Sequence, residues 1–137
     1  MARKWVSHKD NVDTAGDTVS WDIGTLDGWS IKVDSTLSTS PGVDYYFQSS
    51  TDGVNWSTVI YQAGVVGTYT ASGAGGTAIG TGGTVTDASG NVVEYHFNRG
   101  NPNFGAVVNA QYFKFVFDSE DTGDGATIQV DLTGHSN

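Results

Sequence analysis

Length, composition and charge exclude several classes of protein. At 137 residues the chain is long enough to bury one core without staples, and the absence of cysteine rules out a disulfide framework and a thiolate metal site. A net charge of -9 opposes binding to a phosphate backbone, so we expect no nucleic acid among its partners.

The chain begins with a basic segment, MARKWVSHKD, in which Arg3, Lys4 and Lys9 supply half of the six basic residues. No apolar run of signal-peptide length follows, and no stretch is long enough for a membrane span, so we expect no membrane partner. We predict that residues 1–16 form an extended basic N-terminal arm. Its docking residues would be Arg3, Lys4, Trp5 and Lys9; a frayed, solvated terminus is the alternative.

Residues 17–137 alternate apolar and polar side chains, which is the period of a half-buried strand. The alternation is clearest in GWSIKVDS, VDYYFQS, QYFKFVFD and TIQVDLT, with TVSWDI, NWSTVIYQ, VVGTYTA and VVEYHF as less regular candidates. Turn signals such as Asp27-Gly28, Ser40-Pro41-Gly42 and Asp52-Gly53 separate these runs. We predict an all-β domain, an antiparallel β-sandwich or jelly roll of about 7–8 strands.

A glycine-rich segment at 71–84, ASGAGGTAIGTGGT, interrupts the pattern. It matches neither G-x-G-x-x-G nor the Walker motif, because no Lys-Ser/Thr pair follows its glycines. We predict a long loop there rather than a phosphate site or a strand.

The stretch SSTDGVNWS, residues 49–57, could be a ligand-reading loop or a turn. Asp52 favours a turn and Gly53 can take a positive φ, so we predict a hairpin with a three- or four-residue loop. Trp56 would then pack across the hairpin or into the sandwich. Stacking on a sugar is the alternative role for Trp56 and for Tyr46, which points away from the expected core.

Catalytic signals are weak. His8, His96 and His135 lie far apart, and no serine has a G-x-S-x-G context. Glu94 and His96 share one face of a predicted strand, where a surface pair is the simpler interpretation. We expect no enzyme and no cofactor.

The loop DSEDTGDG gathers Asp118, Glu120, Asp121 and Asp124, whose oxygens could bind calcium. The twelfth position from Asp118 is Gln129 rather than a bidentate glutamate. We therefore predict an acidic, solvated turn with no metal and keep these four residues as weak candidates.

Three pieces of the sequence, LDGWSIKVD, YYFQSSTDGVNWSTV and AQYFKFVFDSEDTGDGATIQVDLTG, together resemble small β-sandwich structural proteins of tailed bacteriophages. The resemblance covers most of the chain except the basic arm and the insert 71–84. Its S-x-D-G-x-x-W hairpin is also similar to that of discoidin-like (coagulation factor 5/8 C-type) modules.

The phage resemblance implies a non-enzymatic virion protein made in the host cytoplasm. It implies a capsid decoration (cement) protein, often a trimer, that binds the major capsid protein and stabilises the outer surface of the head; a tail, neck or fibre component is the other possibility. No arm motif carries over, so the docking role of the basic arm is inferred from charge and expected exposure.

The discoidin-like resemblance implies a carbohydrate- or receptor-binding module, with Tyr46 and Trp56 as stacking residues. Such modules present an aromatic face that bears arginine, and Arg99 and Lys114 are two basic residues of the body that could supply one.

Overall fold

The computed structural model describes residues 4–38, 42–60, 69–72, 85–88, 92–100, 107, 109–120 and 127–136. These residues form ten strands and include no helix that could cross a membrane. The strands are β1 (Lys4–Val12), β2 (Thr18–Asp22), β3 (Gly28–Asp34), β4 (Gly42–Ser50), β5 (Ser57–Thr58), β6 (Tyr69–Ser72), β7 (Val85–Ala88), β8 (Val92–Asn98), β9 (Tyr112–Glu120) and β10 (Ile128–Ser136).

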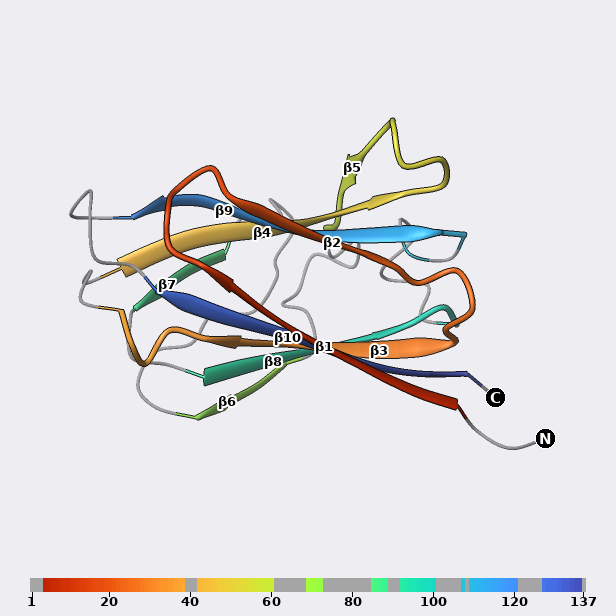
Figure 1. Ribbon diagram of the computed structural model, residues 1–137, viewed down its shortest axis with the longest axis horizontal. Helices are drawn as coiled ribbons and strands as arrows, with labels where there is room; N and C mark the ends of the chain where they lie inside the picture. The colour runs from red at the N-terminus through yellow and green to blue at the C-terminus, as the bar shows by residue number, and fades with distance from the viewer. Residues whose placement is uncertain are drawn as a thin grey trace.

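The strands make two antiparallel sheets that face each other (Figure 1). One sheet has the order β1-β10-β3-β8-β6, and the other has the order β2-β9-β4-β5, with β7 also paired to β4. Leaving out β5 and β6, the strands in chain order change sheet at every step except from β4 to β7. This is the order of a jelly roll, in which two Greek keys interlock. The predicted all-β sandwich or jelly roll is confirmed.

A cluster of aromatic rings lies in the core between the sheets. Trp29 lies 5.4 Å from Phe113 and 5.9 Å from Phe97 between ring centroids, and Phe97 lies 4.8 Å from Phe113. The buried hydroxyl groups of Tyr45 and Tyr95 share a hydrogen bond of 2.7 Å, which joins β4 of one sheet to β8 of the other. Burial of these large rings adds to the apolar contact between the layers.

The four clearest predicted strands are confirmed as β3, β4, β9 and β10. Their alternating apolar side chains are buried, and those on β4 and β10 are no more than 1% exposed. The buried residues are Trp29, Ile31, Val33, Val43, Tyr45, Phe47, Phe113, Phe115, Phe117, Ile128, Val130 and Leu132. Within residues 55–60, the described part of the less regular run NWSTVIYQ, the strand is the two-residue β5. Most of the predicted glycine-rich loop, residues 73–84, lies outside the described residues.

Strand β1 occupies most of the segment that we predicted as a free arm at residues 1–16. Its nine residues pair with β10 from Lys4↔Ser136 to Val12↔Ile128, and Val12 is buried. The prediction considered side-chain charge and neglected the backbone, whose N–H and C=O groups find partners in a ladder whatever the side chains are. The sandwich therefore includes β1 and does not begin at residue 17.

Candidate functional site

The stretch SSTDGVNWS connects β4 to β5 at one edge of its sheet. β4 ends at Ser50 and β5 begins at Ser57, and the two strands pair Ser49 with Ser57 and Gln48 with Thr58. The hairpin is confirmed, but residues 51–56 between the strands make a longer loop than the predicted three or four residues. The backbone of Ser50 is also tied to the neighbouring loop, because its carbonyl accepts a 2.8 Å hydrogen bond from Gln111 N.

Asp52 holds this loop together through its own carboxylate. Its Oδ1 accepts hydrogen bonds of 2.8 Å from the backbone N–H groups of Val54 and Asn55, and its Oδ2 accepts one of 2.8 Å from Asn55 Nδ2. The backbone donors of Asn55 and Val54 are the main reason that the pKa of Asp52 lies well below its ordinary value. Ser50 closes the turn, since its Oγ accepts from Gly53 N at 2.8 Å and donates to Asp52 Oδ1 at 3.0 Å.

Gly53 adopts φ +78, in the left-handed region that we predicted for it. A Cβ built at Gly53 would lie 3.4 Å from Tyr112 Cε2, so the loop backbone packs on the Tyr112 ring at the start of β9. The Asp-Gly pair is therefore explained by turn geometry.

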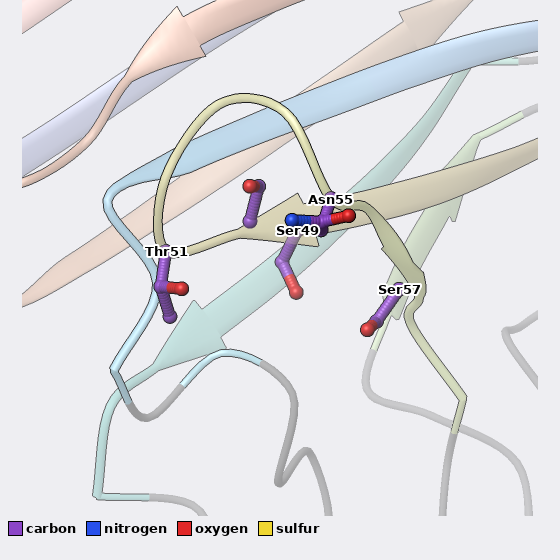
Figure 2. A pocket seen from close by; sticks show the side chains of 5 residues that line it. Ser49, Thr51, Asn55 and Ser57 are labelled. Atoms are coloured by element: carbon purple, nitrogen blue, oxygen red, sulfur yellow. The ribbon is translucent and has the colours of Figure 1, made fainter.

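Five polar residues of this hairpin line a hollow of about 200 Å³, which we call the hairpin hollow: Ser49, Ser50, Thr51, Asn55 and Ser57. Figure 2 shows Thr51 and Ser57 on opposite sides of it, with Ser49 between them. Every lining side chain carries a hydroxyl or an amide, and none carries a charge. Sequence reasoning treated these residues as turn formers; the repeated Ser/Thr at positions 49, 51 and 57 was the signal that it left unused.

Trp56 lies on the outer face of its sheet, where Lys114 of β9 covers its ring. The Lys114 Nζ lies 3.9 Å from the ring centroid, a cation–π contact between the hairpin and β9. We predicted that Trp56 packs across the hairpin or into the sandwich; the contact seen here is instead with a side chain of β9 on the outer face. Tyr46, half-buried between the buried Tyr45 and Phe47, also lies on this outer face.

Arg99, proposed above as part of a ligand-binding face, instead closes one end of the sandwich. Its guanidinium donates hydrogen bonds to the carbonyl oxygens of Ile23 (2.6 Å), Leu26 (2.5 Å), Ala110 (2.8 Å) and Val107 (3.2 Å). Desolvation lowers the pKa of Arg99, while the nearby carboxylate of Asp27 opposes that shift. With its donors directed at backbone carbonyls, this residue is a structural clamp.

The basic residues predicted to dock on a partner are not brought to the hairpin. Lys4, Trp5 and Lys9 belong to β1, at the edge of one sheet, whereas β4 and β5 belong to the other. Arg3 lies outside the described residues. Their docking role remains a prediction.

The remaining candidates are scattered. His96 is exposed and its Nδ1 shares a 2.8 Å hydrogen bond with Ser30 Oγ on the neighbouring strand. Asp118 and Glu120 lie at the end of β9, whereas Asp121 and Asp124 fall outside the described residues. Within the described part of the chain, no group of three His, Asp or Glu side chains could hold a metal ion.

No protein-family model and no curated protein sequence matches the chain. The SPBc2 prophage-derived protein YomS is similar in structure, with a TM-score of 0.62 and 10% identity over 99% of this chain and 96% of that chain. A Bacillus endospore appendage protein, of disulfide-linked pili, aligns over 100% of this chain and 91% of that chain at 14% identity and TM-score 0.42. CBM32 of AlyQ, solved with 4,5-unsaturated mannuronic acid, aligns over 89% and 74% at 10% identity and TM-score 0.42. The likeness to YomS shows a shared fold, and the two lower scores carry no argument.

Proposed function

We propose that the chain is a non-enzymatic structural protein of a bacteriophage particle. The observation that carries the proposal is the agreement with a prophage-derived protein along almost the whole of both chains. That agreement is one of fold, and the role is inferred from the origin of the neighbour together with the phage resemblance of the sequence. The jelly-roll fold is common among viral capsid proteins, which is consistent with such a role.

In its finer form, the proposal is a capsid decoration protein that binds the outer surface of the head through β1. Within the described residues, β1 has β10 as its only neighbour in the sheet. An edge strand can add a strand from a partner by backbone hydrogen bonds. Lys4 and Lys9 lie on β1, and Arg3 precedes it in sequence. On a body of net charge -9, this basic edge would be attracted to an acidic capsid surface.

A homotrimer is the assembly that we propose with this role. In a trimer, binding of one copy to the capsid raises the local concentration of the other two copies at the surface. The trimer can therefore bind tightly even if each copy binds weakly. Light scattering on the purified full chain measures the assembly directly, and a mass equal to one chain of 14.4 kDa at micromolar concentration would contradict the trimer.

Capsid binding can be tested without disturbing the strand ladder. Deleting residues 1–9 would remove most of β1 and uncover β10, so charge-neutral variants are the cleaner choice. The triple variant Arg3→Gln, Lys4→Gln, Lys9→Gln should lose attachment to heads built from the major capsid protein of the same genome. Binding of the unmodified chain should weaken as salt rises, because exposed charges are screened.

Two single variants provide the matched control. Lys9→Gln removes one charge from β1, and Lys32→Gln removes one exposed charge from β3 of the same sheet. We expect the first to weaken binding several-fold and the second to leave it unchanged. Full occupancy by the triple variant would contradict the proposed docking edge.

A carbohydrate- or receptor-binding module is the second candidate. The observation that favours it is the outer face carrying Tyr46 and Trp56, both only partly buried. Lys114 already covers one face of the Trp56 ring, which leaves less of it for stacking. Glycan-array binding that disappears in Tyr46→Ala or Trp56→Ala, with folding intact, would support this candidate over the virion role.

A further inference from the structure

Two hydroxyl groups of the hairpin hollow have no hydrogen-bond partner in the part of the chain that the structure describes. Thr51 and Ser57 are exposed, and their hydroxyls make no hydrogen bond with any described residue. In Figure 2 the Thr51 hydroxyl points toward Ser49, and the Ser57 side chain lies on the opposite side of the hollow. A hydroxyl can donate one hydrogen bond and accept two, so the pair offers several bonds to a ligand.

Two other lining side chains, Ser50 and Asn55, make hydrogen bonds within the loop. Ser50 Oγ accepts from Asp52 N and Gly53 N and donates to Asp52 Oδ1. The amide nitrogen of Asn55 donates to Asp52 Oδ2, which leaves the side-chain oxygen of Asn55 as an acceptor. The hollow therefore presents a mixed set of donors and acceptors with no net charge.

The loop that carries these groups is held in place without a ligand. Asp52 receives three hydrogen bonds from Val54 and Asn55, and the backbone at Gly53 packs on Tyr112. A ligand entering the hollow would not have to order this loop. Preorganisation of this kind lowers the cost of binding.

We propose that the hairpin hollow binds one ring of a neutral saccharide through the hydroxyls of Thr51 and Ser57 and the side-chain oxygen of Asn55. The volume of about 200 Å³ lies below the roughly 300–1,000 Å³ of pockets for drug-sized ligands, which favours a single sugar ring. A saccharide ring offers adjacent hydroxyls that both donate and accept, matching the lining. The ionised Asp52 within the loop and the net charge of -9 disfavour uronic acids and other anions.

This inference goes beyond the virion role and does not depend on it. Its test is a titration of the full chain, followed through the backbone amide signals in ¹H–¹⁵N NMR spectra. The probes are methyl glycosides of glucose, galactose, mannose and N-acetylglucosamine up to about 100 mM, since so open a site implies millimolar affinity. Glucuronate is the charged comparison. We expect at least one neutral probe to shift the amides of Thr51, Asn55 and Ser57, and glucuronate to bind more weakly.

Variants assign the binding to the hollow. Thr51→Val with Ser57→Ala should weaken the bound sugar about tenfold, as expected for the loss of two hydrogen bonds. Thr51→Ser keeps the hydroxyl and should keep the affinity. The matched control, Thr18→Val with Ser20→Ala, changes two exposed residues of β2 outside the hollow and should have no effect.

Two results would overturn the proposal. One is the absence of any shift at Thr51, Asn55 and Ser57 with all four neutral probes at the highest concentration. The other is sugar binding that persists unweakened in the Thr51→Val, Ser57→Ala variant. Binding that is lost in Tyr46→Ala and kept in that double variant would place the sugar on the outer face instead. None of these outcomes depends on capsid attachment, so the two proposals can fail separately.

Discussion

The pairs Asp27-Gly28 and Asp52-Gly53 have the same sequence, yet the two turns are held by opposite means. Arg99, more than 70 positions away, holds the first by donating to the carbonyls of Ile23 and Leu26. The second is held from within, because Asp52 accepts from Val54 and Asn55 two and three residues on. The first turn relies on a side chain from far along the chain, whereas the side-chain hydrogen bonds of the second come from its own residues.

The two pairs also need glycine for different reasons. Gly53 has φ +78, a conformation that other residues adopt only with strain, whereas Gly28 has no positive φ. At Gly28 the constraint is space, because an added Cβ would lie 2.9 Å from Cε1 of His135. The same dipeptide therefore marks a backbone requirement in one place and a packing requirement in the other.

Removing Arg99 should lower the free energy of unfolding more than any other change proposed here. It tests whether the turn before β3 depends on this distant side chain. Arg99→Met keeps much of the side-chain volume but leaves four backbone carbonyls without their charged donor. We expect the free energy of unfolding to fall by about 3 kcal/mol, measured by urea denaturation, since hydrogen bonds to charged groups contribute about 1.5–3 kcal/mol each. Lys114→Met, which removes a cation lying over Trp56, should cost less than about 1 kcal/mol. Equal losses in the two variants would contradict a stabilising role for the hydrogen bonds that Arg99 donates to the four carbonyls.

Gly53→Val should have the next largest effect and tests the local turn. A β-branched residue in the left-handed region is strained, and we expect a loss of about 2 kcal/mol in the free energy of unfolding. The added Cβ would meet Tyr112 at an ordinary contact distance of 3.4 Å, so the backbone and not a clash is the cause. Gly53→Asn, which tolerates this conformation better, should lose less than half as much. The same loss in both variants would contradict a backbone origin.

Gly28→Ala should cost less, about 1 kcal/mol, because it crowds a side chain that can move. The atom nearest to the new Cβ is Cε1 of the His135 ring at 2.9 Å, and the backbone oxygen of Phe97 lies 3.3 Å away. The loss should shrink when His135 is replaced by alanine in the same chain, as a double-mutant cycle would measure. An unchanged loss in that background would mean that Gly28 is needed for its backbone, as Gly53 is.

The contrast also explains what could be predicted from the sequence. The left-handed Gly53 and the alternation that buries Trp29, Ile31 and Val33 are local properties, and both were predicted. The clamp role of Arg99 depends on carbonyls from two separate parts of the chain, residues 23–26 and 107–110, and no local pattern reveals it. The same limit explains why residues 4–12 were predicted as an arm, since their partner β10 lies at the far end of the sequence.

The hairpin hollow was missed for a related reason. Ser49, Thr51 and Ser57 are ordinary turn and strand residues in the sequence. Pairing of Ser49 with Ser57 across the hairpin brings their side chains to one place. A register of this kind is set by the length of the loop, which was predicted to be shorter than residues 51–56.

The smallest effect is expected for Asp52→Asn, and its pH dependence is the informative part. The N–H groups of Asn55 and Val54 hold the folded-state pKa of Asp52 below its ordinary value of 3.8. The stabilisation is therefore fully present above pH 3.8 and is lost as the pH falls below it, toward the folded-state pKa. The free energy of unfolding of both chains should be measured from about pH 6 to about pH 2.5. The unmodified chain should be more stable than the variant near pH 6, and this difference in stability should become smaller toward pH 2.5. A difference that stays constant across this range would mean that the carboxylate charge does not hold the turn. Since every partner of Asp52 lies between Ser50 and Asn55, the amide signals of the Arg99 clamp should not change at any pH in the variant relative to the unmodified chain.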